Sequence, residues 1–372
     1  MYRSFPGNLL DDGKEMTRTA LVFTPKYYEH KTGLGHPESP KRLKAIIKQL
    51  EKSNLLSSTG KCELVEPALA SEEDLELVHT TEHIRLVKRA CEHGGGLLDL
   101  GDTVASRESF EVARLAVGGA MKAVDLVLTK KFKNAFALVR PPGHHAGPYY
   151  AMGFCIFNNV AVAAAHLITR LGFDRVAILD VDAHHGNGTQ EIFYKTDKVL
   201  YISMHEDPQD FPESGFVDEV GEGKGVGYTV NIPFPFKAGD EEHLQALDQI
   251  VLPIIQQYEP QFLLASVGYD AYCRDPVAKL SLSASAYAAA FEKILGLASI
   301  VCEDRFVAVL EGGYSLRHLG QLVASTISKM ANLPYTMEDG YPCSRLPGER
   351  TRKKAEKILK EVKNTQSSFW NL

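Results

Sequence analysis

Residues 175–190 read RVAILDVDAHHGNGTQ. The first half is a continuous apolar run, which is typical of a parallel strand covered on both faces. The second half places two carboxylates and two imidazoles directly after that strand. Asp182 and His184 are two residues apart, so in extended backbone both side chains leave the same face. The stretch therefore predicts a buried strand that is followed by two candidate metal ligands, Asp182 and His184.

Similar β-rich runs alternate with helical patterns along the chain. The pattern predicts five further strands, at 20–25, 135–139, 199–205, 261–270 and 305–314, and helices at 109–128, 158–171, 241–258 and 283–299. This alternation favours βαβ units and an open, mostly parallel sheet. No internal repeat or linker divides the chain, so we expect one α/β domain. The C-terminal tail is a basic, helix-like segment, for which a solvated surface helix is favoured over a partner-binding role.

Composition narrows the function classes. The chain has 372 residues, 44% of them hydrophobic, and a net charge of −6. These values exclude a disordered chain and argue against direct nucleic-acid binding. No apolar run approaches a membrane span, and the first 20 residues lack a secretory signal. Six cysteines without a CxxC pair predict reduced, buried thiols, so we expect a cytoplasmic protein.

A third metal ligand has to come from another strand. Asp270, which ends SVGYD, is the best candidate, because ligands of open α/β sheets bind at the carboxyl ends of the strands. Three protein ligands and an open position define a catalytic zinc site. The same donors also suit Fe(II) or Co(II). A binuclear, arginase-like manganese site is disfavoured, because Gly186 stands where such sites carry a further aspartate.

Two more strand ends carry candidate catalytic groups. Residues 140–146 read RPPGHHA, a rigid turn with two histidines suited to acid–base work on a metal-bound water. An imidazole paired with the carboxylate of Asp180 is pushed toward its charged form. One paired with the neutral Asn187 keeps its pKa near the reference of about 6.5 and can act as a base. Residues 310–316 read LEGGYSL, in which a glycine turn presents the hydroxyl of Tyr314 as an oxyanion donor.

With HPESPKR (residues 36–42) and MGFCIFNN (152–159), these motifs strongly resemble the zinc-dependent histone deacetylase superfamily. They are most similar to its class II-like and prokaryotic branch, which includes acetylpolyamine amidohydrolases and acetoin-utilisation proteins. The resemblance covers residues 19–335 and leaves 1–18 as an N-terminal extension and 336–372 as a packed or helical tail. It implies an arginase/deacetylase-like fold with a central, eight-stranded, mostly parallel sheet flanked by helices.

The resemblance also implies roles for single residues. Zn²⁺ is expected on Asp182, His184 and Asp270. The catalytic residues are expected to be His144, His145 (the likelier base), Tyr314, Asp180 and Asn187. Substrate contacts are expected from Asp102, Gly153, Phe154, Phe211 and Val277. Structural K⁺ or Na⁺ ions are expected at two sites, the first formed by Asp180, Asp182, His184, Ser203 and Met204, the second by Phe193, Thr196, Val199 and Tyr228.

The implied reaction is metal-dependent removal of acetyl groups from the ε-amine of lysine in proteins or peptides. Polyamine-selective members carry Glu after the Asp-Pro that follows the zinc aspartate, whereas Val277 stands here, which favours acetyl-lysine. The alternatives are a deacetylase of acetylpolyamines or other small acetylated amines, a non-catalytic acyl-lysine binder, which the intact histidines and Tyr314 disfavour, and a binuclear ureohydrolase. The physiological substrate, the cellular metal and a homo-oligomeric state stay open.

Overall fold

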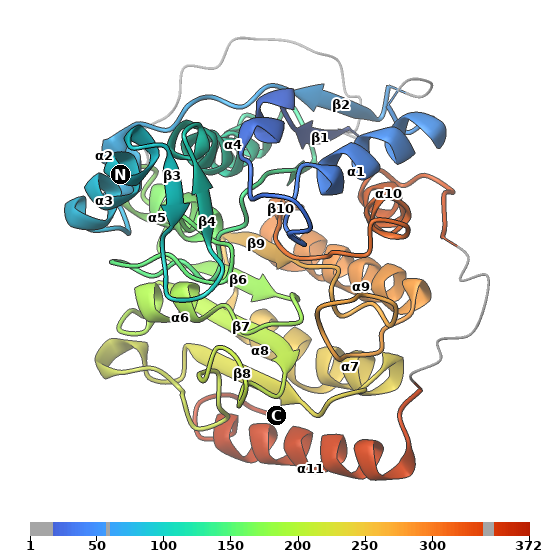
Figure 1. The fold of residues 1–372 in the computed structure, drawn as a ribbon. Helices are drawn as coiled ribbons and strands as arrows, with labels where there is room; N and C mark the ends of the chain where they lie inside the picture. The colour runs from blue at the N-terminus through green and yellow to red at the C-terminus, as the bar shows by residue number, and fades with distance from the viewer. Residues whose placement is uncertain (1–17, 57–59, 338–345) are drawn as a thin grey trace.

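Eight parallel strands form one central sheet in a computed structural model that describes residues 18–56, 60–337 and 346–372. Their order is β2-β1-β5-β10-β9-β6-β7-β8 (Figure 1). The strands are β1 (Thr19–Val22), β2 (Cys62–Val65), β5 (Asn134–Ala137), β6 (Val176–Asp180), β7 (Val199–Glu206), β8 (Thr229–Phe234), β9 (Phe262–Val267) and β10 (Phe306–Leu310). The expected parallel sheet is confirmed. The two strands that periodicity did not single out, β2 and β8, are the two edges.

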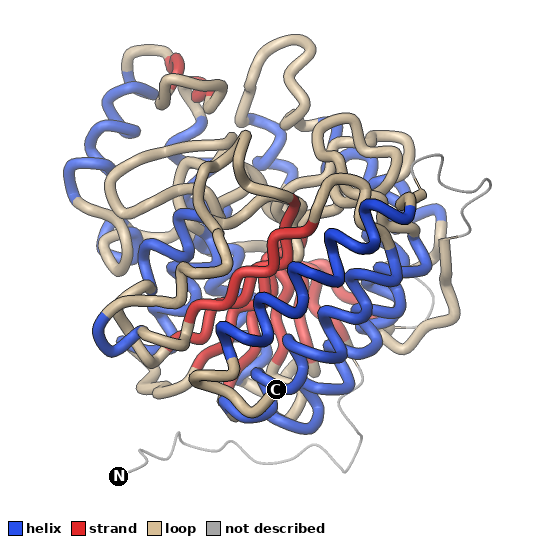
Figure 2. The backbone as a smooth tube through the Cα atoms, turned by 90° about the horizontal axis from the view of Figure 1, so that it is seen from below, coloured by secondary structure: helices blue, strands red, loops and turns tan. Residues whose placement is uncertain are grey.

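Helices cover both faces of the sheet (Figure 2). One face carries α1 (Lys41–Lys52), α7 (Asp240–Ala246), α8 (Leu252–Tyr258), α9 (Ala284–Cys302) and α10 (Leu319–Met330). The other carries α2 (Glu72–Leu75), α3 (Thr81–Glu92), α4 (Ser109–Leu128), α5 (Asn159–Thr169) and α6 (Asn187–Phe193). A short hairpin, β3 (Gly95–Leu97) and β4 (Val104–Ser106), stands apart from the sheet. The helix expected at 241–258 runs from α7 into α8 through a π-helical segment, Leu247–Val251.

The core lies between the sheet and its two helical layers. Every residue of β1, β5, β6, β9 and β10 is buried, as their continuous apolar runs predict. Among the described residues one helix, α9, is long and apolar enough to cross a membrane by length and composition alone. The sequence predicted a helix at 283–299 but no segment apolar enough to span a membrane, because Glu292 and Lys293 interrupt the apolar run. Since α9 packs on β9 and β10, its apolar character also fits a core helix.

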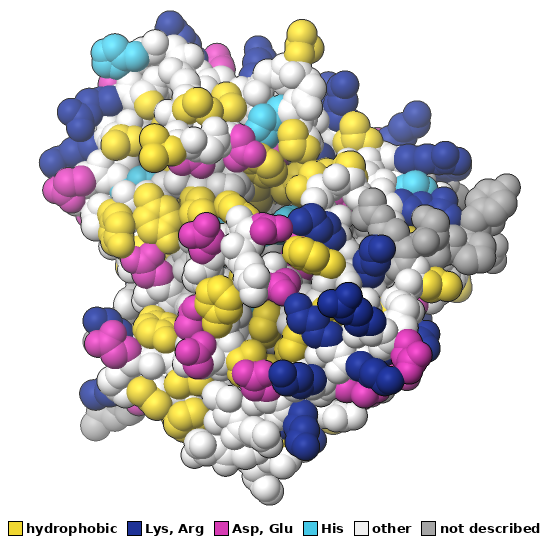
Figure 3. Space-filling model, turned by 60° about the horizontal axis from the view of Figure 1, so that its bottom comes forward, with side chains coloured by type: hydrophobic (Ala, Val, Ile, Leu, Met, Phe, Trp, Pro, Cys, Tyr) yellow, Lys and Arg dark blue, Asp and Glu magenta, His cyan; other side chains and the backbone are white. Residues whose placement is uncertain are grey.

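The C-terminal helix α11 (Glu349–Gln366) lies along the edge strand β8. It buries Ala355, Leu359 and Val362, and its remaining positions are rich in Lys and Arg. Figure 3 shows basic side chains gathered on this side of the molecule. Beyond the helix, the indole of Trp370 donates to the carbonyl of Gly227 at 2.9 Å, which fixes the chain end against the sheet.

The cysteines differ from the sequence expectation at one position. Cys62, Cys91, Cys155 and Cys302 are buried and free, as expected. The expectation of a reduced thiol is wrong for Cys273, which is disulfide-bonded. Spacing along the chain carries no information about which thiols approach each other in space, so composition alone did not reveal this bond.

Polar residues end three adjacent strands of the sheet. Asp180 is the last residue of β6, Glu311 directly follows β10, and Asp270 lies three residues after β9, which runs between them. Because all strands are parallel, these ends meet at one edge. The fold thus delivers the candidate residues to one place.

Burial of histidines in this fold predicts acid sensitivity. His79 accepts the N–H of Asn158 at 2.8 Å, and its other nitrogen lies 2.9 Å from the carbonyl of Gly147, so only the neutral ring makes both bonds. Burial lowers the pKa of His79 to about 3. The unfolded chain takes up this proton below a pKa of about 6.5, whereas the folded chain does not, so stability falls as the pH drops from about 6.5 toward 3.

We expect the free energy of unfolding, measured with denaturant, to fall by up to about 1.4 kcal/mol per pH unit for this residue in that window. His79→Gln, which keeps a donor and an acceptor, should reduce the slope. His93→Gln, at an exposed position, should not. An unchanged slope in the His79 variant would contradict this assignment.

Candidate active site

Three side chains from two adjacent strand ends form the candidate metal centre. Asp182 and His184 follow β6, and Asp270 follows β9; one ligand atom from each lies within 4.8 Å of the others. Nδ1 of His184 is 3.0 Å from Oδ2 of Asp270 and 3.3 Å from Oδ1 of Asp182. The predicted i, i+2 pair and its third partner are therefore brought together.

The donor set fits a dication. Asp182 and Asp270 are fully buried, and burial together with the charge of Asp182 raises the pKa of Asp270. Two buried carboxylates side by side are costly unless positive charge compensates them. A Cβ atom on Gly312 would lie 2.6 Å from an oxygen of each, so only glycine fits against the pair. Two oxygens and one nitrogen suit Zn²⁺ with an open position, and also Fe(II) or Co(II).

The two tandem histidines have different partners. Nδ1 of His144 lies 3.1 Å from Oδ2 of Asp180, and Nδ1 of His145 lies 2.8 Å from Oδ1 of Asn187. The rings are neighbours, with centroids 4.0 Å apart. The amide of Asn187 also donates to the hydroxyl of Tyr150 at 3.0 Å, which fixes its carbonyl oxygen toward His145.

These partners drive the two pKa values apart. Burial alone would lower the pKa of His144, but Asp180 and Asp182 outweigh burial and raise it to about 10. Burial and the positive charge of His144 lower the pKa of His145 well below its ordinary value. The shift of His145 is larger than the sequence suggested, because sequence reasoning considered the neutral partner but not the cationic neighbour. One imidazole is thus held charged and the other neutral.

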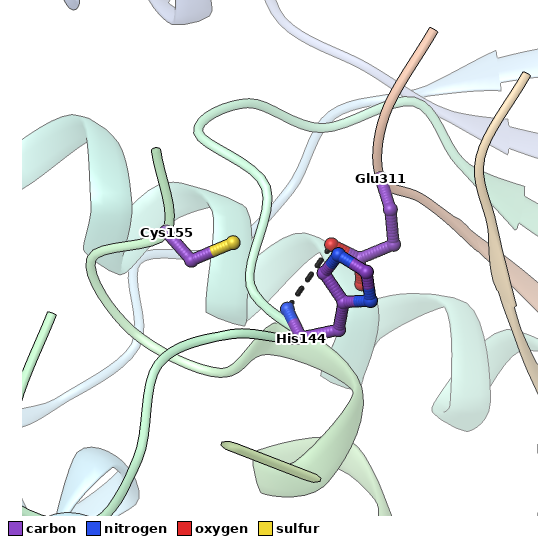
Figure 4. Close-up of side chains that lie close together, drawn as sticks. All are labelled: His144, Cys155 and Glu311. Atoms are coloured by element: carbon purple, nitrogen blue, oxygen red, sulfur yellow. Dashed lines mark hydrogen bonds between the residues drawn. The ribbon is translucent and has the colours of Figure 1, made fainter. Parts of the chain in front are cut away.

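Glu311 holds the histidine turn in place. Its Oε2 accepts the backbone N–H groups of Gly143 (2.6 Å) and His144 (3.2 Å), and Figure 4 shows the second of these bonds. Cys155 lies close enough to make His144, Cys155 and Glu311 a second cluster of potential ligands. Burial raises the pKa of the Cys155 thiol well above its ordinary value, and its Sγ donates to the carbonyl of Gly153 at 3.4 Å. We therefore interpret this cluster as structural.

Aromatic rings flank the approach to the histidines. The Phe211 ring centroid is 5.0 Å from that of His145, and the Phe154 centroid is 5.7 Å from that of Tyr314. Gly153 has a positive φ of 54°, and a Cβ there would lie 2.5 Å from the His145 ring. A side chain at this position would thus obstruct the candidate base.

The other expected substrate contacts lie on loops around this group. Asp102 lies in the connection between β3 and β4, and its carbonyl is 3.1 Å from Nε2 of His36. The N–H of Val277 donates to Oδ1 of Asp275 at 3.0 Å. Asp102 therefore lies on the β3–β4 loop beside His36, and Val277 lies on the loop that follows Asp270.

The residues expected to hold monovalent ions occupy neighbouring strands and loops. Asp180 and Ser203 are paired residues of β6 and β7, and Met204 is the next residue. For the second site, the carbonyl of Phe193 accepts the N–H of Thr196, and the carbonyl of Tyr228 accepts the N–H of Tyr201, two residues beyond Val199. These contacts join Phe193 to Thr196, and Tyr228 to the strand that begins at Val199.

Two buried charged residues, Arg42 and Asp275, bind the backbone of the loop that carries Tyr314. Sequence reasoning gave neither residue a role. The guanidinium of Arg42 lies 5.0 Å from the Tyr314 ring centroid, and its Nε donates to the carbonyl of Gly313 at 2.7 Å. Asp275 accepts the N–H of Tyr314 at 2.6 Å. Arg42 is the last residue of the HPESPKR motif, and Asp275 is the aspartate of the Asp-Pro pair. No local sequence pattern predicted that these two charged side chains would be buried.

The comparisons with known proteins agree with this geometry. A family model described as histone deacetylase domain matches residues 36–330. The chain is 41% identical over 359 residues to a probable deacetylase of Archaeoglobus fulgidus, covering 95% of this chain and 98% of the relative. It is 37% identical over 305 residues to a histone deacetylase-like amidohydrolase of Pseudomonas aeruginosa, covering 82% and 79%. The crystal structure of the HDA15 HD domain matches with a TM-score of 0.84 and 33% identity over 96% of both chains.

The family model spans well over half of the chain, and its limits include the metal triad, the tandem histidines, Tyr314 and every strand of the central sheet except β1. The expected family and arginase/deacetylase-like fold are therefore confirmed. This chain belongs to the histone deacetylase family of deacetylases and amidohydrolases.

Proposed function

We propose that this protein hydrolyses the acetyl amide on the ε-amine of lysine in proteins or peptides, with one Zn²⁺ per chain held by Asp182, His184 and Asp270. The observation that carries the proposal is the convergence of this buried triad with a neutral, Asn187-paired His145. A non-catalytic binder would need the triad but would have no use for two histidines with opposed charge states. A site that holds both charge states is equipped to move protons.

A bound Zn²⁺ would supply Lewis-acid polarisation of the acetyl carbonyl and a water of lowered pKa. His145 is neutral, and its Nε2, the nitrogen not engaged with Asn187, accepts a proton as water attacks the acyl carbon. Burial raises the pKa of Tyr314 well above its ordinary value, so the phenol keeps its proton and donates a hydrogen bond to the developing oxyanion. A protonated imidazole of the pair then delivers a proton to the nitrogen as the C–N bond breaks, and acetate and the free amine leave.

The remaining expected residues have roles in this proposal. Gly153, Phe154 and Phe211 flank the acyl-lysine chain, and Asp102 binds the substrate backbone. Val277 offers no charge to a cationic polyamine, which supports acetyl-lysine over small acetylated amines. Structural K⁺ or Na⁺ ions would occupy the two sites named from the sequence, where carbonyl oxygens suit hard cations.

Adding Zn²⁺ to metal-free protein should raise the unfolding midpoint and bind one ion per chain. At a hundredfold excess over Kd the gain is about 2.7 kcal/mol, because the ion binds only the folded triad. Asp270→Asn should lose this gain, whereas Asp210→Asn, at an exposed carboxylate, should keep it. Thermal unfolding measures the midpoint, and metal analysis measures the number of ions bound per chain. Two ions per chain would favour a binuclear ureohydrolase-like site instead.

Tyr314→Phe should lower kcat by about 10²–10³-fold and leave Zn²⁺ content and KM nearly unchanged, since only the oxyanion donor is lost. Steady-state hydrolysis of an acetyl-lysine peptide measures this. Tyr149→Phe, at an exposed tyrosine, is the matched control. A Tyr314 variant with the turnover of the unaltered protein would remove Tyr314 from the mechanism.

Turnover of acetyl-lysine peptides should exceed that of acetylpolyamines on the zinc-loaded protein. Val277→Glu should shift the ratio of kcat/KM values toward the polyamine by roughly fivefold, because one new ion pair is worth about 1 kcal/mol. Val277→Gln, similar in size but uncharged, should not shift it. If the unaltered protein prefers the polyamine, the substrate assignment is wrong and the small-amine alternative takes its place.

A further inference from the structure

We infer that Asp275 is the positioning residue for Tyr314, and that its carboxylate fixes the phenol relative to the metal centre. This inference rests on the proposed function, because it deepens the role given there to Tyr314. Asp275 does not touch the reacting atoms and acts through the backbone that it binds.

The contacts of Asp275 are directed at one loop. The residue is 1% exposed, and its Oδ2 accepts two consecutive backbone N–H groups, those of Tyr314 (2.6 Å) and Ser315 (2.9 Å). Its Oδ1 accepts the N–H of Val277 at 3.0 Å. One carboxylate therefore joins the loop that carries the phenol to the loop that follows the metal ligand Asp270.

The hydrogen bonds of Asp275 restrict movement between the Tyr314 loop and the loop that follows Asp270. Burial and the nearby charge of Asp270 raise the pKa of Asp275 to about 7, and its three N–H donors oppose that shift by stabilising the ionised form. The bonds that Asp275 accepts are shorter and stronger when its carboxyl group is ionised, which is the state that predominates above a pH of about 7. Without the carboxylate, the amides of Tyr314 and Ser315 would be left buried without this partner, so the loop cannot keep its conformation at no cost.

The loop is held from its other side as well. Arg42 donates from Nε to the carbonyl of Gly313 at 2.7 Å and also binds the carbonyl of Glu311. Gly313 itself has a positive φ of 111°, which a side chain would disfavour. Arg42 thus binds the carbonyls before Tyr314, and Asp275 binds the amides at and after it.

The connection to the metal centre is short. Asp275 lies five residues after Asp270, and its N–H donates to the carbonyl of Tyr272 at 2.8 Å. Tyr272 in turn donates to the carbonyl of Tyr269 at 3.4 Å, so the segment between ligand and carboxylate is a series of turns. A shift of about 1 Å in a catalytic group can cost on the order of 10²-fold in rate. The hydrogen bonds from Tyr314 and Ser315 to Asp275 therefore determine whether the phenol is placed to donate to the oxyanion.

A double-mutant cycle tests the inference. Asp275→Asn keeps the shape but removes the carboxylate, and we expect kcat to fall by up to about 10²-fold with much smaller changes in KM and Zn²⁺ content. In the Tyr314→Phe background, which has no phenol to place, the same change should cost less than about threefold. Asp210→Asn serves as the exposed carboxylate control in both backgrounds. Equal losses of kcat with and without the phenol would overturn the inference, since a merely structural role acts on both.

Amide hydrogen exchange gives a readout that does not depend on activity. The Tyr314 and Ser315 amides should exchange slowly in the unaltered protein and faster in Asp275→Asn. Unprotected amides in the unaltered protein would overturn the inference even if the variant does not fold. If Tyr314→Phe keeps full turnover, the proposed function fails at Tyr314, and the exchange data still show whether Asp275 holds the loop.

Discussion

Burial of like charges at the carboxyl edge of the sheet is the constraint on which this site depends. Asp180, Asp182, Asp270 and Glu311 are each at most 1% exposed. Each accepts hydrogen bonds from backbone N–H groups of the surrounding loops; Asp182, for example, accepts those of His184 (2.9 Å) and Gly312 (2.8 Å). Because an unsatisfied buried carboxylate is costly, the loops can close over this edge only with their amides turned inward. The conformations of these loops therefore depend on the positions of the buried carboxylates that their amides bind.

The same constraint explains why adjacent, chemically identical histidines behave differently. His144 faces Asp180 and is held charged, and that charge then disfavours a proton on His145. Replacing the neutral Asn187 by a carboxylate would oppose this effect at His145. The different charge states of the two rings thus follow from their partners, the carboxylate of Asp180 at the end of β6 and the amide of Asn187 at the start of α6.

Sequence reasoning predicted the strands that are buried on both faces and the polar residues directly behind them, because both are local properties of the chain. It placed Asp182, His184 and Asp270 together from strand ends alone, and the structure brings their ligand atoms within 4.8 Å. It gave no role to Arg42, Glu311 or Asp275, whose importance comes from distant backbone groups; Arg42 and Gly313 are 271 residues apart in the chain. It also missed the edge strands, which are less apolar, and the disulfide at Cys273, for which spacing gives no signal.

Gly186 stands at a position where the surrounding side chains leave no room for a further aspartate. Its φ of −77° is open to any residue, so the restriction is space and not backbone strain. A Cβ atom there would lie 2.4 Å from Oδ2 of Asp180, 2.5 Å from the hydroxyl of Tyr201 and 3.1 Å from Nδ1 of His144. An aspartate at this position, the residue that a binuclear centre would require, would collide with the pair that keeps His144 charged. The Asp180–His144 pair and a further metal-binding aspartate would occupy the same volume. With glycine at position 186, that volume is left to the Asp180–His144 pair.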